Sequence, residues 1–460
     1  MFTLPFNKKY LIPIFLYLSN LVIQNYNLGK LVYVVNDEGV YLYSAKLLTQ
    51  GFIPYKDFFL AQPVFLVYLA GFLLKAVNFN MELFRLLYTC WVFSIVFPIF
   101  FIVFKFTKSI SASTVSIILL STFPELVQWD MHSFALREAS LPFLAFAMYF
   151  IYVKPRLRLS GLLLGLFAIS LLSNLLVSLC FIFLLITSEI FSGKKILKIL
   201  QEKSHLIFTF IIVSILGYLP IFLIAGGYNN LIGYQLERPP LSYGTRIEWI
   251  KLYTLKNNWP ILLFGFLGSL INNKTLILFG IFNILSFVIL VFFGRSYYPH
   301  YLSILAVGLA ITSGFLMKRL GKTNLLTIII NYIVIFSIFS SSYYHLKTYL
   351  FDTTTPDFFQ IINLLKDTPE PIFTFEPVYA LYAKKDLTFH YNVADMRYFP
   401  VIGKDLDDLS YLKILKSSKT VLIEPFASSR LNNNSLSYIY RNFRQIYNNN
   451  IYQIYVRDIQ

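Results

Sequence analysis

Three groups of polar and aromatic residues stand beside long apolar segments of this sequence, and their residue types could do acid–base or anion-binding chemistry. Their members are Asp37, Glu38, Tyr55, Lys56, Asp57 and Gln62 in the first group, Asp130, His132, Arg137 and Glu138 in the second, and Arg295, His300 and Tyr301 in the third. Carboxylates can accept protons from hydroxyl groups, and guanidinium and imidazole groups can bind oxyanions. Each group also has a purely structural interpretation.

The first group opens with two adjacent carboxylates, Asp37 and Glu38, at the head of an amphipathic stretch that predicts a helix. Carboxylates in the first turn of a helix are stabilised by the helix dipole and the free amide groups, so helix capping is the structural interpretation. The functional interpretation is a general base held at a membrane surface. Spacing alone leaves both open.

The second and third groups carry arginine and histidine side chains, which can bind anions. Arg137 and Glu138 start an apolar segment, where they could anchor it at an interface or serve a site, because ionisable groups near membrane depth are functional candidates. Arg295 and His300 lie in a loop of seven residues and could form a compact cationic site. A guanidinium plane suits phosphate oxygens, although the tyrosines nearby could equally form an interfacial aromatic belt.

The elements that position these groups are predicted to be membrane helices. The chain is 57% hydrophobic and 13% charged, about half the charge of a soluble domain. About eleven apolar stretches are long enough to cross a bilayer or nearly so. They cover residues 10–28, 84–106, 110–128, 138–153, 159–172, 175–191, 206–226, 260–271, 275–293, 301–317 and 323–345. The pair Ser173-Asn174 is predicted to turn the chain between two short spans.

The charge pattern predicts the orientation. The net charge of +16 lies in the first 350 residues, since acidic and basic residues balance in 351–460, and nucleic-acid binding is therefore not favoured. Basic residues concentrate in alternate short loops, which predicts that the N-terminus is inside and the C-terminus outside. The outer loops would be 29–83, 129–138, 227–259 and 294–300, and the apolar stretch 63–77 would be a surface helix rather than a span.

Two domains follow from this layout. Residues 1–345 are predicted to form an all-α polytopic membrane domain, and residues 346–460 a small extracytoplasmic α/β domain. The predicted helices of the tail are Phe358–Leu365 and Leu409–Leu415, and its predicted strands are Ile372–Phe375, Thr420–Glu424 and Tyr452–Arg457.

The order of these motifs resembles the GT-C glycosyltransferases, most closely the branch with the protein O-mannosyltransferases, the aminoarabinose transferase of lipid A and the Rgt-like sugar transferases. The resemblance covers nearly the whole chain. It rests on Asp37-Glu38-Gly39 with Tyr41, on Pro54-Tyr55 with Asp57 and Gln62-Pro63, then on Arg85, Glu138, the stretch 295–301 and the α/β tail. There is one departure, because the aminoarabinose transferase carries Lys-Pro where this chain has Gln62-Pro63.

The resemblance implies transfer of a sugar, with inversion, from a polyprenyl- or dolichyl-phosphate donor to a protein, lipid or glycan acceptor outside the cytoplasm. Asp37 would be the catalytic base, with Glu38 and Glu138 as further acids. The donor phosphate would be bound by Arg295, His300, Tyr301, Arg137 and Lys56. The sugar or acceptor would be contacted by Tyr55, Asp57, Gln62, Arg85, Asp130 and His132.

Two points stay open at this stage. No cofactor is indicated, and a divalent metal is possible but two carboxylates do not define a site. The main alternative function is a polytopic transporter or flippase for lipid-linked sugars, and a non-enzymatic envelope scaffold is a third. Transporters commonly show internal repeats and ionisable residues at mid-membrane, and neither is evident in this sequence.

Overall fold

The computed structural model describes residues 8–25, 36–121, 123, 134–224, 226–237, 240–271, 274–293, 299–320, 355–388, 408–425 and 431–457. The chain divides into two compact units. The helical unit comprises Met1–Leu28, Arg85–Pro220 and Pro240–Phe351. The mixed unit comprises Gly29–Phe84, Ile221–Pro239 and Asp352–Gln460. The sequence predicted a different kind of division, into a membrane domain of residues 1–345 and a soluble tail of residues 346–460. That division stays a prediction.

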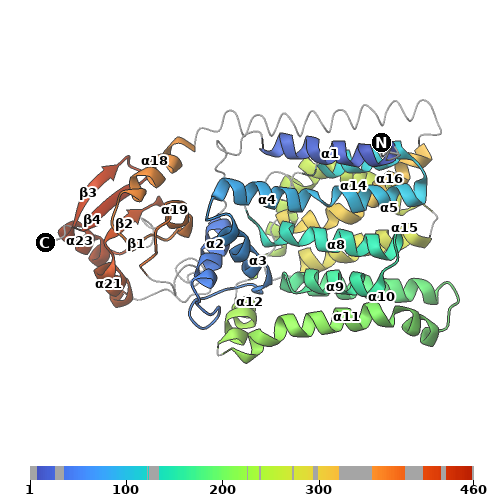
Figure 1. Ribbon diagram of the computed structural model, residues 1–460, viewed down its shortest axis with the longest axis horizontal. Coiled ribbons are helices and arrows are strands. Elements are labelled where there is room, and N and C mark those ends of the chain that lie inside the picture. Colours follow the sequence, from blue (N-terminus) through green and yellow to red (C-terminus); the bar gives the residue numbers. More distant parts are fainter. Residues whose placement is uncertain are drawn as a thin grey trace, which may run out of the picture. The chain divides into compact units, whose positions relative to one another are not determined.

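The helical unit consists of helices packed side by side, and several of its long helices run roughly parallel in Figure 1. They are α1 (Lys8–Asn25), α4 (Met81–Phe93), α5 (Val96–Thr107), α6 (Ile110–Ser121), α8 (Leu136–Tyr152), α9 (Leu157–Ala168), α10 (Leu172–Ile190), α11 (Ile196–Leu223), α13 (Tyr243–Trp249), α14 (Lys256–Ser269), α15 (Lys274–Val288) and α16 (Ser303–Leu320). The start of α4, up to Phe84, and the end of α11, from Ile221, belong to the mixed unit. Short π segments, η2 (Ile250–Leu255) and η3 (Ile289–Phe293), and the 3-10 turn η4 (Pro299–Leu302) connect some of them.

Three helical stretches of the described chain are long and apolar enough to cross a membrane, namely Met81–Thr107, Leu172–Ile190 and Ile196–Leu223. The last is notable because most of its apolar side chains are exposed, among them Phe208 at 65% and Leu216 at 63%. Water would disfavour such a surface and lipid would not. Shorter apolar helices include Leu157–Ala168 and Ile277–Phe292.

Most helix bounds lie within about four residues of the predicted spans, but α11 begins ten residues before the predicted span 206–226, and the predicted span 84–106 is divided into α4 and α5. The apolar stretch 159–191 is divided into α9 and α10, as predicted, but the chain turns at residues 169–171 and not at Ser173-Asn174. Asn174 lies inside α10, where its side chain is buried and donates to the carbonyl of Phe167 at 3.1 Å. The predicted span 323–345 lies outside the described residues. The number of crossings and the N-in, C-out orientation stay predictions.

Glycines let the helices of this unit approach closely. A Cβ atom added to Gly161 of α9 would overlap the carbonyl oxygen of Leu206 in α11. One added to Gly268 of α14 would overlap the carbonyl oxygen of Thr312 in α16. Small residues at such crossings bring helix backbones into contact, as is common in membrane helix bundles.

The mixed unit contains the helices of the first predicted outer loop and a small α/β layer. The helices are α2 (Asn36–Thr49), α3 (Phe65–Ala76), η1 (Asn229–Gly233), α12 (Tyr234–Glu237), α18 (Thr355–Lys366), α19 (Pro377–Tyr382), α21 (Asp408–Ser417) and α23 (Asn433–Asn442). The strands are β1 (Ile372–Phe373), β2 (Thr420–Ile423), β3 (Phe443–Asn448) and β4 (Gln453–Arg457). Their order is β1-β2-β4-β3, with β1 and β2 parallel and the other pairs antiparallel.

Alternate residues of these strands belong to two separate cores. Leu422 and Ile454 pack with α18 and α19, whereas Val421 and Tyr455 pack with α21 and α23. The sheet is therefore covered on both faces, which is the α/β layer that the sequence predicted. Sequence analysis did not predict β3, because only Phe443 of its six residues is buried.

Helix α3 coincides with the stretch 63–77 that was predicted to lie at the membrane surface. One side of it packs on α2, where a Cβ atom at Gly71 would lie 2.9 Å from the carbonyl oxygen of Ala45. The other side exposes apolar residues, with Phe72 77% and Tyr68 51% accessible. A helix with one packed and one exposed apolar face suits an interfacial position, which stays a prediction.

Candidate active site

The first carboxylates lie where the sequence predicted a helix to begin. Asp37 and Glu38 occupy the first turn of α2, which starts at Asn36. The side chain of Glu38 is fully buried, whereas that of Asp37 is partly accessible. The two adjacent carboxylates therefore differ in their access to solvent, and their roles stay predictions.

Helix α2 is held along one side by the C-terminal part of the mixed unit. A Cβ atom at Gly39 would lie 2.7 Å from both Cβ and N of Val378, so the helix touches α19 there. One turn later, the hydroxyl of Tyr43 accepts a hydrogen bond from the backbone N–H of Leu387 at 2.7 Å. Lys46 then pairs with Asp386 at 2.8 Å. Positions 39, 43 and 46 share one helix face. Sequence analysis named Gly39 only as part of a motif and did not single out Tyr43 or Lys46.

Tyr43 is the buried centre of this contact. Its hydroxyl is enclosed between α2 and the segment that contains Leu387, and burial raises its pKa above the ordinary value for tyrosine. The hydroxyl therefore stays neutral at all physiological pH values. Lys46 lies with its ammonium 5.2 Å from the centre of the Tyr43 ring and also donates to the carbonyl of Lys385 at 2.8 Å. The contact thus combines hydrogen bonds with an ion pair.

The other members of the first group build a tight loop. Tyr55 has a positive φ of 67°, and its hydroxyl donates to the backbone carbonyl of Gln62 at 2.8 Å. The carboxylate of Asp57 accepts from the N–H of Ile53 at 2.7 Å. Lys56 is exposed at the tip. In the structure, Tyr55 and Asp57 therefore shape the loop, and their proposed contacts with substrate stay predictions.

A second segment of the mixed unit supports this loop. Asn230 of η1 donates to the carbonyl of Tyr55 at 2.8 Å, and Gln235 of α12 donates to that of Ala61 at 3.1 Å. The ring of Tyr234 meets Phe59 edge-on at 5.5 Å. Nothing in the sequence indicated these three residues, because their contacts span more than 170 positions.

In the helical unit, the second and third groups come together. Arg137 of α8 lies with its guanidinium carbon 4.0 Å from the ring centre of Tyr301, and its Nη1 donates to the carbonyl of the same residue at 3.3 Å. The adjacent Glu138 is fully buried and accepts a 2.6 Å hydrogen bond from Ser303. Sequence analysis predicted roles for Arg137, Glu138 and Tyr301 and missed Ser303, whose residue type alone gives no signal.

Further hydrogen bonds hold the start of α8 in place. The hydroxyl of Ser140 donates to the carbonyl of Arg137 at 2.5 Å and accepts from the amide of Asn174 at 2.9 Å. From α4, the indole of Trp91 donates to the carbonyl of Ala139 at 2.7 Å. Arg85, also on α4, is buried with 5% of its surface accessible and lies one turn before Tyr88, whose hydroxyl donates to the carbonyl of Ala135.

Several predicted residues have no described side chain. Arg295, Asp130 and His132 lie outside the described residues, and His300 is placed only as part of η4. Their roles stay predictions. Among the described residues, no three His, Cys, Asp or Glu side chains come close enough to hold a metal ion. The described part of the chain therefore provides no set of metal ligands, and the possibility of a metal stays as open as the sequence left it.

Comparison with solved structures relates the fold to a known one. The chain is similar to ArnT from Cupriavidus metallidurans in the apo state, with a TM-score of 0.70 and 11% identity over 96% of this chain and 97% of that one. It is also similar to ArnT from the same organism bound to undecaprenyl phosphate, with a TM-score of 0.68 and 11% identity over 97% of both chains.

Sequence comparison alone finds no counterpart: no protein family and no curated protein matches the chain. The similarity is therefore one of fold, and it extends across nearly the full length of both proteins. The chain has the fold of ArnT. This likeness confirms, at the level of the fold, the resemblance that the motifs predicted.

Proposed function

We propose that this protein is a membrane glycosyltransferase that takes its sugar from a polyprenyl-phosphate donor. The observation that carries the proposal is the match over 97% of the chain to an ArnT structure bound to undecaprenyl phosphate. A second support is the set of apolar helices in the described chain, which would place the protein in the membrane that contains such a lipid.

In the proposed reaction, Asp37 is the general base. It takes the proton of an acceptor hydroxyl while that oxygen attacks the anomeric carbon of the sugar. The bond from the anomeric carbon to the phosphate oxygen breaks, its electron pair leaves with the polyprenyl phosphate, and the anomeric configuration inverts. The partial accessibility of Asp37 at the start of α2 supports this role, because a base must reach the proton it abstracts.

Negative charge builds on the leaving phosphate as the sugar becomes oxocarbenium-like, so fixed cations would lower the barrier most. Arg137 is the described cation best suited to this task. Its guanidinium is held by the ring and the carbonyl of Tyr301, and only one of its five N–H groups is used by that carbonyl. Arg295, His300 and Lys56 complete the proposed phosphate-binding set, and Lys56 or Arg137 would supply the charge that Gln62 lacks.

The acidic residues other than Asp37 have supporting roles. Glu138 is fully buried and bonded to Ser303, so we assign it to positioning of the Arg137 segment rather than to proton transfer. Glu38 is likewise buried within the mixed unit. The acceptor is proposed to be extracytoplasmic, as the charge pattern predicts.

The test is the variant Asp37→Asn, assayed in membranes with isotopically labelled polyprenyl-phosphate sugars and a count of label released from the lipid. Loss of a general base should reduce transfer by about 10²–10⁴-fold. Asp357→Asn is the matched control, because Asp357 also lies in the first turn of a helix of the same unit. Unchanged transfer by Asp37→Asn would remove Asp37 from the mechanism. Lipid-linked sugar that crosses the membrane without transfer would favour the transporter alternative.

A further inference from the structure

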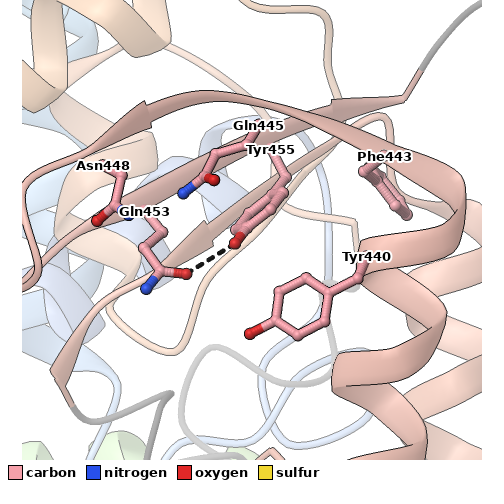
Figure 2. A pocket seen from close by; sticks show the side chains of 6 residues that line it. All are labelled: Tyr440, Phe443, Gln445, Asn448, Gln453 and Tyr455. Atoms are coloured by element: carbon pink, nitrogen blue, oxygen red, sulfur yellow. Dashed lines mark hydrogen bonds between the residues drawn. The ribbon is translucent and has the colours of Figure 1, made fainter.

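A groove of about 430 Å³ lies on the C-terminal α/β layer, and none of its lining residues is assigned a role in the proposed reaction. Figure 2 shows the six residues that line it: Tyr440, Phe443, Gln445, Asn448, Gln453 and Tyr455. Tyr440 comes from the last turn of α23, and the others come from the hairpin of β3 and β4. The volume is in the range of sites for small ligands.

The register of β3 and β4 places the side-chain amides of Gln445, Asn448 and Gln453 on one face of the hairpin. Gln445 pairs with Tyr455, and Asn448 pairs with Gln453. Residues two apart on β4 share a face, so both pairs point the same way. On β3, residues 445 and 448 would ordinarily point to opposite faces, but a register shift between Gln445 and Tyr447 turns Asn448 onto the face of Gln445. The bulge is what brings the three carboxamides together.

The lining is uncharged and can both donate and accept hydrogen bonds. Each of the three carboxamides offers two donors and an acceptor. The hydroxyl of Tyr455 donates to Oε1 of Gln453 at 2.8 Å, which directs the amide nitrogen of Gln453 away from that hydroxyl (Figure 2). No acidic or basic side chain is among the six, so a charged ligand would lose hydration here without gaining a counter-charge.

Tyr440 adds an aromatic wall. Its side chain is 58% accessible, and its ring lies 5.8 Å from that of Tyr455 at an angle of 51°. Sugar hydroxyls are donors and acceptors at once, as the carboxamides are, and the C–H face of a pyranose packs on an aromatic ring. We propose that this groove binds an uncharged saccharide. The proposal goes beyond the transferase function and does not rest on it.

The test is saturation-transfer NMR on the full chain, purified in a detergent without a sugar head group. The probes are maltotetraose, cellotetraose, chitotetraose and α-linked mannotetraose, with an oligogalacturonate as the charged comparison. Because the groove is open and offers few contacts, we expect a Kd on the order of 1 mM for at least one neutral probe. Tyr440→Ala should weaken binding by about tenfold or more, and Tyr440→Phe, which keeps the ring, should retain most of it.

Asn442→Ala is the matched control, since Asn442 is an exposed carboxamide near the groove that does not line it. Gln445→Ala removes a carboxamide of the groove at an exposed position and is a second variant that should weaken binding. The proposal is overturned if no neutral probe binds, if Tyr440→Ala and Gln445→Ala bind as well as the unmodified chain, or if the oligogalacturonate binds more tightly than every neutral probe. Loss in these two variants with binding retained in Asn442→Ala supports it.

Discussion

Arg137 shows how much the geometry of a side chain depends on its immediate neighbours. The side chain is 8% accessible, and Tyr301 contacts it both through its ring and through its backbone carbonyl. These contacts fix the plane of the guanidinium as well as the position of its charge. Orientation matters because a planar fork can bind two oxygens of one phosphate at once.

Arg137→Lys should therefore raise the KM for the lipid donor by about tenfold while the KM for the acceptor stays unchanged. Lysine keeps the positive charge but loses the planar fork and its packing on the Tyr301 ring. The measurement is initial-rate kinetics with each substrate varied in turn. Arg158→Lys, at an exposed position at the start of α9, is the control. An unchanged donor KM would contradict the phosphate-binding role.

Glu424 is a second residue whose properties follow from its surroundings. It comes directly after β2, is fully buried, and accepts hydrogen bonds from the N–H of Phe375 at 2.9 Å and the hydroxyl of Thr374 at 3.3 Å. Burial, with a smaller contribution from the charge of Glu376, raises the pKa of Glu424 to about 8. The two hydrogen bonds oppose this shift but do not cancel it.

The raised pKa predicts pH-dependent stability of the α/β layer. Since the unfolded pKa is near 4.5 and the folded pKa is about 8, the folded state binds more protons between these values. The free energy of unfolding therefore falls as pH rises from about 4.5 to about 8, and it stays low above that range. Glu424→Gln cannot ionise and should remove this dependence, so the variant should gain stability over the unmodified chain at pH 9.

Hydrogen–deuterium exchange of the β1 and β2 peptides in the full chain, corrected for the intrinsic effect of pH, measures this change. Asp367→Asn is the control, because Asp367 is exposed. Equal protection of Glu424→Gln and the unmodified chain at pH 9 would show that Glu424 is not the group responsible.

At the scale of elements, α2 is the clearest case of a helix predicted from sequence whose position depends on distant residues. Its start at Asn36 and its two N-terminal carboxylates follow from local pattern. Its contacts with Val378, Leu387 and Asp386 do not, because more than 300 residues separate the partners. The C-terminal part of the mixed unit thus determines how the helix with the candidate base is held.

Gly39→Ala should disturb this contact. A Cβ atom would lie 2.7 Å from Val378, so α2 or α19 must move, at a cost of about 1–3 kcal/mol. We expect faster hydrogen exchange in α2 and α19 and reduced transfer activity. Gly233→Ala is the matched control in the same unit, because its Cβ atom would meet only Asn229 at 3.9 Å. Equal exchange in both variants would argue against the close contact at Gly39.

The elements themselves were largely predictable, and the exceptions have physical reasons. Long apolar stretches predicted most helices of the helical unit, since apolar length is a local property. Strand β3 was not predicted. It is an edge strand, and most side chains of its sequence, Phe-Arg-Gln-Ile-Tyr-Asn, are exposed, so the sequence lacks the apolar pattern of a buried strand. The turn between α9 and α10 was placed a few residues late, because Asn174 is buried within α10 by its bonds to Ser140 and Phe167.

For the molecule as a whole, the ArnT fold and the charge pattern together define a topology that can be tested. The fold itself says nothing about which end faces outward, and the prediction of an outer C-terminus rests on the basic loops. An epitope tag after Gln460 should be accessible to antibody on intact cells or spheroplasts. A tag between Lys194 and Lys195 should become accessible only after the membrane is made permeable. The reverse pattern would invert the proposed location of the reaction.

The sequence by itself determined that this is a chain of apolar helices with an α/β tail, and its motif order pointed to a fold that the likeness to ArnT confirms. These features depend on local hydropathy and on motifs read in order along the chain. Only the tertiary structure decided that Arg137 stacks on Tyr301 and that Glu138 bonds to Ser303, across 164 and 165 positions. It likewise decided that Asp37 and Glu38, adjacent in sequence, differ in burial. Such contacts depend on the path of the whole chain, which local pattern does not encode.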